Sequence, residues 1–384
     1  MFRVPCNERQ DLKDQAEFYG FDFYRIDNDV YWDETAYYQL SLKQIETHLE
    51  DPSNELEQIC LDLVDRVVKD DYWLRKFCIP ESSWQWIADS WQNNELSLYG
   101  RFDFSYNGNS PAKLLEYNAD TPTSLYEASF FQWQWLEQQV DSGVLPRSAD
   151  QFNSIQERLV RRFTEFKRNN TLHLAYCRDS IEDQGTVMYL QDCAFQAGHS
   201  TSLLPIESIG VDDSGQLTDL DDNQIELLFK LYPWEQLFED EFSCHLTTTK
   251  TTFIEPPWKA ILSNKAILPL LWQLHPNHPN LLPAYFSGEE KGGLEGGFVS
   301  KPLFGREGSN VTWFHPRKGR IHQSGSYGKE GYITQALAPL PRFNNNSTLL
   351  GVWMVAHEAC GLTIREDNSP ITKDTARFVP HIIA

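Results

Sequence analysis

Two predicted strands place acidic side chains on one face, where a fold would ordinarily avoid them. Residues 96–104 and 113–118 have strand character, and an Asn-Gly pair at 107–108 between them is typical of a turn. Alternate side chains of a strand point to opposite faces, so the stretch LLEYNAD has three oxygen-bearing side chains on one face. These are Glu116, Asn118 and Asp120. Their charges repel, so the fold must supply something that neutralises this face.

A metal ion can do so if the two strands pair in one particular register. The stretch RFDF has Arg101 and Asp103 on one face, and Asp103 meets Glu116 and Asn118 only if these faces coincide in an antiparallel pair. A two-residue turn would put Asp103 opposite Ala112, so the site requires a connection of roughly six residues or more. Carboxylate and amide oxygens suit Mg²⁺. The alternative is an ordinary solvated strand face.

Charge and cysteine content exclude several classes of partner. The formal net charge is −22, from 55 acidic and 33 basic residues, so there is no basic excess for nucleic acid or an anionic membrane. The acidity favours attraction of metal ions or an amine, or it only keeps a cytosolic protein soluble. The 7 cysteines are scattered singly, which favours reduced thiols in the cytoplasm. The N-terminus is polar, and no apolar run approaches the ~20 residues that span a bilayer.

The chain divides into regions of different pattern. With 41% hydrophobic and 13% aromatic residues it can bury a substantial core. Residues 1–100 are predicted to be mainly helical, and residues 101–170 to supply the acidic strands and a following helix. The β–α–β rhythm of residues 171–254 predicts a small open α/β subdomain, and in residues 255–384 short strands alternate with glycine loops. We therefore expect an α/β fold in which residues 1–384 form one catalytic unit.

A strand lysine followed by a glycine-containing loop forms a second candidate site. The stretch FVSKPLFGREGSNV runs from Lys301 into residues 305–310. Backbone N–H groups of such a loop can cradle phosphate oxygens, and the ammonium group adds positive charge. The stretch is not a Walker A motif, because GxxxxGK[ST] is absent. The alternative is a loop that only turns a corner.

Two further cationic side chains could meet a phosphate. Lys265 stands at the start of a predicted helix in EPPWKAILSNKAILPLLW. In IREDNSPITKD we expect Arg365, Glu366 and Asp367 to lie in a short polar loop between two strands, where a guanidinium group can bind phosphate. The ordinary alternatives are a surface lysine and an exposed salt bridge.

Taken together, these segments resemble the synthetase domain of bifunctional glutathionylspermidine synthetase/amidase, and still more closely its stand-alone relatives, described as acid–amine ligases. The motifs in order are RFDF, LLEYNAD, EPPWKAILSNKAILPLLW, SKPLFGREGSNV, ITQALAPLP and IREDNSPITKD. The resemblance covers most of the chain. It implies a permuted ATP-grasp fold with a small open α/β (pre-ATP-grasp) subdomain and an N-terminal helical region.

The resemblance also implies the site residues. Two Mg²⁺ ions bridging the ATP phosphates would be held by Asp103, Glu116 and Asn118. The nucleotide would contact Lys265, Lys301, Glu307, Gly308, Gln335, Ala336, Leu337 and Ala338. Catalysis would use Arg365 and Arg101, and the acid substrate would contact Arg101, Thr121, Glu182 and Asp183.

The implied activity is an ATP- and Mg²⁺-dependent carboxylate–amine ligase that forms an amide through an acyl phosphate. Its partners would be small-molecule acid and amine substrates, of peptide and polyamine type. Three positions depart from the glutathione-binding member: Gln236 stands for a threonine, Glu307 for a cysteine and Thr121 for a serine. The resemblance is therefore stronger at the positions that bind the nucleotide than at the positions that bind the thiol peptide.

Two other classes of function stay open from the sequence alone. A nucleotide-binding protein with residual ATPase activity and no synthetase activity fits the departure at Gln236. A glycoside hydrolase fits the aromatic-rich, acidic composition and its paired carboxylates, although nothing in GREGSN supports it.

Overall fold

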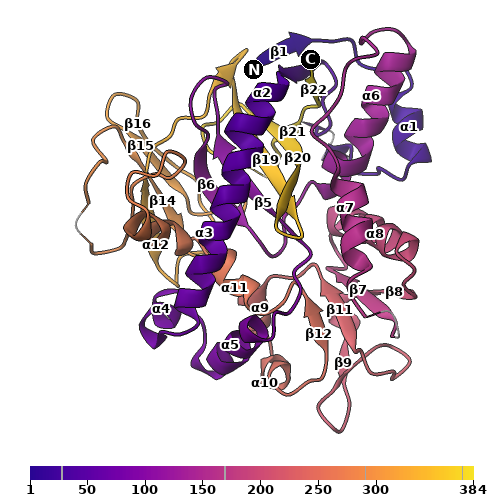
Figure 1. Ribbon diagram of the computed structural model, residues 1–384, viewed down its shortest axis with the longest axis vertical. Coiled ribbons are helices and arrows are strands. Elements are labelled where there is room, and N and C mark those ends of the chain that lie inside the picture. Colours follow the sequence, from indigo (N-terminus) through magenta and orange to yellow (C-terminus); the bar gives the residue numbers. More distant parts are fainter. Residues whose placement is uncertain (27–28, 168–169, 290, 374) are drawn as a thin grey trace.

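An antiparallel sheet in which the two acidic strands are neighbours forms the centre of the molecule (Figure 1). The computed structural model describes residues 1–26, 29–167, 170–289, 291–373 and 375–384. In spatial order the strands are β21 (Arg377–Phe378), β20 (Glu358–Asp367), β19 (Asn346–Val355), β5 (Tyr99–Ser105) and β6 (Lys113–Asn118). A short strand, β18 (Arg342–Phe343), also pairs with β19. Antiparallel pairing of β5 with β6 is the arrangement that the metal hypothesis requires.

A long amphipathic helix packs against this sheet and crosses it diagonally in Figure 1. It is α3 (Asp51–Val67), which continues from α2 (Leu42–Ile45) through the π-helical turn η1 (Glu46–Glu50). Ser41 starts α2 with a capping box. Apolar positions of α3 recur at three or four residues and are buried, namely Leu56, Cys60, Leu63, Val64 and Val67. Each large buried side chain contributes roughly 1.5–3 kcal/mol, so this face holds the helix on the sheet.

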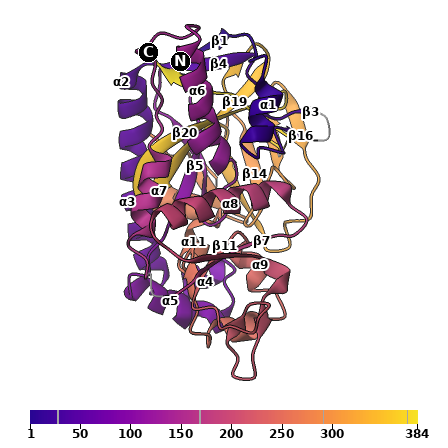
Figure 2. The same cartoon turned by 90° about the vertical axis from the view of Figure 1, so that its right-hand side faces the viewer.

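A separate parallel sheet forms the small α/β subdomain that the sequence predicts. Its order is β12 (Thr252–Ile254), β11 (Leu227–Lys230), β7 (Leu172–Tyr176) and β8 (Thr201–Pro205). The helix α8 (Ile181–Gln196) connects β7 to β8, as a parallel pair requires. Figure 2 shows α8 lying across this sheet, with its first turn at the carboxyl end of β7.

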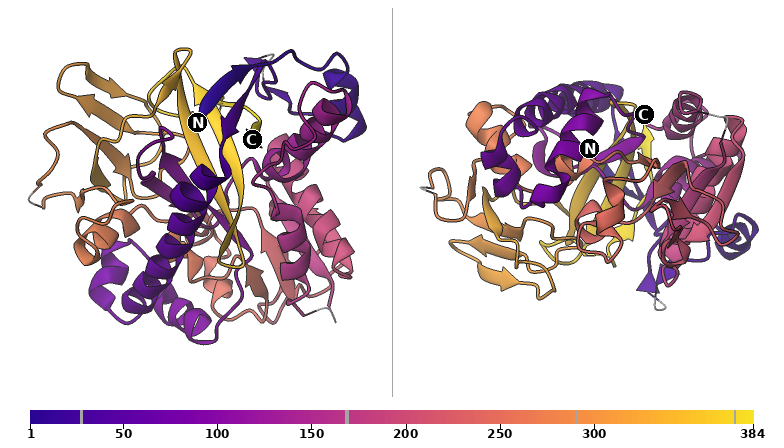
Figure 3. Two further views of the ribbon diagram at one scale, coloured as in Figure 1. Left: turned by 45° about the horizontal axis from the view of Figure 1, so that its top comes forward. Right: turned by 90° about the horizontal axis from the view of Figure 1, so that it is seen from below.

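A second antiparallel sheet lies on the other side of the central sheet, as Figure 3 shows from below. Its strands, in spatial order, are β13 (Ala284–Phe286), β17 (Tyr332–Ala336), β14 (Phe298–Pro302), β15 (Thr312–His315) and β16 (Gly319–His322). Lys301 lies in β14 and Gln335 in β17, the strand paired with it. This sheet therefore brings two of the expected nucleotide residues together.

The two ends of the chain meet in a small sheet of β1 (Phe2–Pro5), β4 (Ala36–Leu40) and β22 (His381–Ile383). Among the described residues, no helix is both long and apolar enough to cross a bilayer. The remaining helices are α1 (Leu12–Phe18), α4 (Asp71–Lys76), η2 (Glu81–Ser83), α5 (Trp84–Gln92), η3 (Glu127–Phe131), α6 (Gln132–Asp141), α7 (Ile155–Phe163), η4 (Ile206–Ser208), α9 (Trp234–Leu237), α10 (Ser243–Leu246), α11 (Lys259–Leu262) and α12 (Ile267–Leu274). The remaining strands are β2 (Arg25–Ile26), β3 (Asp29–Val30), β9 (Gly210–Val211) and β10 (Leu217–Thr218).

Two expectations about local structure are wrong. Arg365, Glu366 and Asp367 are not in a polar loop but complete β20, where Arg365 lies opposite Leu349 of β19 and beside Phe378 of β21. Pairing on both sides keeps this polar stretch extended, which composition alone does not reveal. Asp120 also leaves the acidic face, because β6 ends at Asn118.

Candidate active site

The acidic residues of the two strands are opposite one another. Asp103 pairs with Glu116 and Arg101 with Asn118, and a bulge follows Asp103. The connection, residues 106–112, is longer than the tight turn that would have separated them. The expected convergence of Asp103, Glu116 and Asn118 is therefore present.

The contacts within this cluster show how its charge is balanced. The Arg101 guanidinium donates to both carboxylate oxygens of Asp103, at 2.7 and 3.0 Å, and Asn118 Nδ2 donates to Asp103 Oδ2 at 2.9 Å. Burial raises the pKa of the Asp103 carboxyl even though Arg101 opposes the shift. At Glu116 burial acts in the same direction, but the nearby Lys265 and Lys301 dominate and lower its pKa.

The cluster fits a divalent cation. Two carboxylates and an amide are hard oxygen donors, and the raised pKa of Asp103 means that its negative charge is only partly compensated. Among the described residues, no group of three or more His, Cys, Asp or Glu side chains could hold a metal. The candidate metal site therefore depends on the Asn118 amide together with Asp103 and Glu116.

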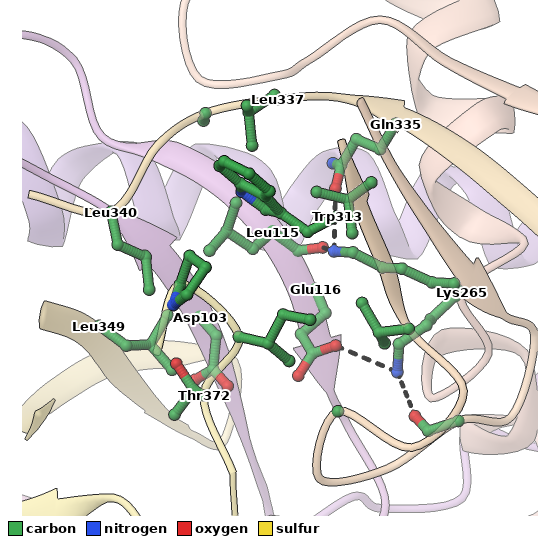
Figure 4. A pocket seen from close by; sticks show the side chains of 18 of the residues that line it. Asp103, Leu115, Glu116, Lys265, Trp313, Gln335, Leu337, Leu340, Leu349 and Thr372 are labelled. Carbon is green, nitrogen blue, oxygen red and sulfur yellow. Dashed lines mark hydrogen bonds and ion pairs between the residues drawn. The ribbon is translucent and has the colours of Figure 1, made fainter. Parts of the chain in front are cut away.

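Two lysines that line the cavity contact the acidic strand β6, and Figure 4 labels one of them, Lys265. Lys265 Nζ lies 3.1 Å from Glu116 Oε2 and also donates to the Gly305 carbonyl. Lys301 Nζ donates to the Leu115 carbonyl at 2.8 Å and to Gln335 Oε1 at 3.0 Å. Burial lowers the pKa of Lys301 to about 8. Both lysines therefore point into one cavity, with their charges only partly neutralised.

The rest of that cavity is apolar and suits a planar base. It is lined by Val299, Val311, Trp313, Leu337, Leu340, Leu349 and Ile371, and Figure 4 shows Trp313, Leu337 and Leu340 gathered at one end. The expected hinge residues Gln335, Ala336, Leu337 and Ala338 all line it. A cavity with charge at one end and an apolar slot at the other matches the shape of a nucleotide.

The loop after β14 forms one wall of the cavity. Glu307 and Gly308 both line it, and both have left-handed backbone angles, with φ of 52° and 72°. A side chain at Gly308 would come within 2.7 Å of Ile371 Cγ2 and 3.1 Å of the Thr372 carbonyl. Glycine is therefore required there by conformation and by space.

A second cavity adjoins the first. It shares Asp103, Glu116, Glu307 and Gly308 with the nucleotide cavity. Its further residues include Arg101, Asn118, Thr121, Arg306 and Arg365. The Arg365 guanidinium donates to the carbonyls of Lys373 and Ala376, at 3.1 and 3.2 Å, which fixes its orientation. Three of the residues expected at the acid substrate or in catalysis thus line one cavity.

Glu182 and Asp183 lie at the start of α8, which Ser180 caps. Burial raises the pKa of Glu182 to about 8, and the neighbouring Glu127 and Asp183 add to the shift. Burial also raises the pKa of Asp183 to about 6, with Glu307 contributing. The effect of Glu307 shows that both carboxyl groups lie near the loop of residues 305–310. Their raised pKa values mean that the ionised forms are disfavoured.

Several residues of this region were missed by sequence reasoning. Tyr31 donates to Glu127, which is fully buried. Burial raises the pKa of the Glu127 carboxyl, although Tyr31, Arg365 and Arg101 oppose the shift. Asp120 forms a buried ion pair with Lys230, 2.7 Å apart. The sequence showed that Arg306 is a polar residue in the glycine-containing loop. The contacts of Tyr31 with Glu127 and of Asp120 with Lys230 join residues far apart in the chain, so they leave no periodic signal in the sequence.

The chain is similar in sequence to several known proteins. A protein of Haemophilus influenzae described as an acid–amine ligase is 43% identical over 97% of both chains. The trypanothione synthetase of Crithidia fasciculata is 29% identical over 83% of this chain, and the bifunctional glutathionylspermidine synthetase/amidase of Escherichia coli is 28% identical over 90%. The matches span 52% and 59% of the lengths of these two relatives.

The fold and the family are also supported over the whole chain. The solved structure of a glutathione synthetase-like effector from Globodera pallida covers 100% of both chains with a TM-score of 0.56 and 9% identity, which supports the fold alone. Residues 3–384 match the family described as glutathionylspermidine synthase preATP-grasp. The chain therefore belongs to the glutathionylspermidine synthase family.

Proposed function

We propose that this protein is an ATP- and Mg²⁺-dependent carboxylate–amine ligase of permuted ATP-grasp type. The observation that carries the proposal is the register that places Asp103 opposite Glu116, beside two lysines and a glycine loop in one cavity. The Haemophilus relative, which matches this chain over 97% of both lengths, is described as an acid–amine ligase. This description supports the same class of reaction.

The nucleotide side would bind ATP with its base in the apolar slot and its phosphates toward Lys265, Lys301 and the Glu307–Gly308 turn. Asp103, Glu116 and Asn118 would hold two Mg²⁺ ions, which supply charge neutralisation for the triphosphate. Glu116 would exchange its contact with Lys265 for the metal, and the lysine would turn to the phosphates.

The reaction needs no protein nucleophile. The substrate carboxylate would take the γ-phosphoryl group, breaking the bond to the β-phosphate and giving an acyl phosphate and ADP. An amine nitrogen would then attack the acyl carbon, releasing phosphate and a proton and leaving an amide. Arg101 and Arg365 flank the cavity where the acyl group would lie, so they would orient it and balance its developing charge.

The acceptor side favours substrates that carry an ammonium group. Glu182 and Asp183 hold their negative charge at a cost, and a nearby cation would relieve it. An acid of amino acid or peptide type, joined to an organic amine of polyamine type, fits these carboxyl groups together with Thr121 and Arg101. The acidic balance of the chain supports the same class of substrate.

The test is ADP release from ATP and Mg²⁺ with a panel of small peptide acids and amines, taken singly and in pairs. The proposal predicts that one class of acid accelerates ADP release and that an added amine yields the amide, detected by mass. Arg365→Lys should slow that release strongly, whereas the exposed Arg317→Lys should not. Slow ADP release that no acid and amine accelerates would instead mean a nucleotide-binding protein with residual ATPase activity.

A further inference from the structure

One arginine ties the phosphate loop to the small α/β subdomain. Arg306 Nε and Nη2 each lie 3.0 Å from Glu235 Oε1, and Nη1 donates to Thr121 Oγ1. The Arg306 side chain is 28% exposed and that of Glu235 only 9%. An ion pair with this geometry, largely withdrawn from water, contributes more than an exposed one.

Both partners of Arg306 are fixed by a buried ion pair. Asp120 accepts from Lys230 Nζ at 2.7 Å and from the Trp234 N–H at 2.8 Å. Asp120 directly precedes Thr121 in the chain, and Trp234 directly precedes Glu235. Because Asp120, Lys230 and Trp234 are buried, the surface that receives Arg306 is rigid.

The residues on either side of Arg306 belong to the nucleotide cavity. Gly305, Glu307 and Gly308 all line it, and the Gly305 carbonyl accepts from Lys265. At the far end of the loop, Asn310 bonds to the carbonyl of Tyr327 and to the N–H of Gly325. The contacts of Arg306 with Glu235 and Thr121 therefore restrict how far the loop can move away from the position that the triphosphate would occupy.

We propose that Arg306 and Glu235 form a latch that holds the phosphate loop in its nucleotide-binding position before nucleotide arrives. The proposal rests on the proposed function and names the residues that couple its nucleotide and acceptor sides. Arg306 lies between loop residues that line the nucleotide cavity, and it donates to Thr121, which lines the second cavity. A loop fixed beforehand loses less conformational entropy on binding, so the latch strengthens nucleotide binding without touching it. Arg306 and Glu235 are positioning residues in this account.

A direct role for Arg306 makes the opposite prediction for its partner. If the guanidinium itself bound the phosphates, Glu235 would compete for it, and Glu235→Gln would tighten nucleotide binding. If the pair is a latch, both Glu235→Gln and Arg306→Gln weaken binding. The sign of the effect of Glu235→Gln therefore separates the two roles.

The experiment measures the dissociation constant of a non-hydrolysable ATP analogue with Mg²⁺ by calorimetry, for both single variants and for the double variant. Hydrogen exchange of the 303–311 amides is followed in parallel without nucleotide. The matched controls are Arg317→Gln, an exposed arginine in the turn between β15 and β16, and Glu81→Gln, whose pair with Arg75 is largely exposed.

The latch predicts that each single variant raises the dissociation constant about tenfold, that the double variant does no worse than either, and that loop exchange speeds up in all three. The controls should behave as wild type, and the exchange of β5 and β6 should not change. Tighter binding by Glu235→Gln, or wild-type loop exchange in both single variants, would overturn the latch. A wild type that binds no nucleotide would refute the proposed function, and the exchange data would still decide the latch.

Discussion

The two cavities that meet at Asp103 and Glu116 differ in how their charges are compensated. On the nucleotide side, Glu116 lies 3.1 Å from Lys265, and the lysines lower the pKa of its carboxyl. Beside the second cavity, in the first turn of α8, Glu182 and Asp183 have raised pKa values because burial and neighbouring carboxylates outweigh the nearby arginines. The nucleotide side therefore stabilises its carboxylate, whereas the carboxyl groups of Glu182 and Asp183 are shifted toward their neutral forms, and a bound cation would favour their ionised forms.

The joint between the end of β6 and the small α/β subdomain is the buried ion pair of Asp120 with Lys230, and breaking it should have the largest effect. Lys230→Met leaves Asp120 buried without its cation, so we expect the free energy of unfolding to fall by about 3–5 kcal/mol in denaturant titrations. The control is Lys69→Met, which breaks an exposed pair with Asp65 and should cost about 1 kcal/mol or less. Equal losses in the two variants would show that the joint is not structurally important.

The nucleotide side should depend strongly on Lys301. Lys301→Met removes a charge that faces the cavity, and we expect nucleotide affinity to fall by roughly ten- to a hundredfold in calorimetry. Because the pKa of Lys301 is about 8, wild-type affinity should also decline from pH 7 to pH 9 as the ammonium group loses its proton. Lys301→Arg keeps its charge in this range, so a decline of the same size in that variant would assign the effect to another group.

The acceptor side should show a smaller effect that depends on pH. The folded pKa of Glu182, about 8, lies above the ordinary value of 4.5, so the folded state binds more protons between these values and loses stability as pH rises. Glu182→Gln removes this loss, and the variant should gain roughly 3 kcal/mol relative to wild type between pH 5 and pH 8. Thermal unfolding at both pH values measures the gain. A stability difference between the variant and the wild type that is independent of pH would contradict the raised pKa of Glu182.

The sequence predicted the parts of the site that follow from local pattern. Period-two alternation placed Glu116 and Asn118 on one face, and the metal hypothesis required a long connection that brings Asp103 to them. The structure has that register, and β6 has the predicted bounds of Lys113–Asn118. Arg365 was placed in a loop because its neighbours are polar, although pairing with β19 and β21 keeps it in a strand. The contact of Arg306 with Glu235 spans 71 positions, and such a contact has no signature in a single sequence.

The central claim is that Glu116 belongs to a magnesium-dependent nucleotide site. Its most direct test is thermal unfolding with ATP, with and without Mg²⁺, for the wild type, Glu116→Ala and the exposed control Glu8→Ala. At about a hundred times its dissociation constant, ATP with Mg²⁺ should add roughly 2.7 kcal/mol to the stability of the wild type and of Glu8→Ala. This gain should vanish in Glu116→Ala and in the wild type without Mg²⁺. No gain in the wild type, or an equal gain in Glu116→Ala, would contradict the account.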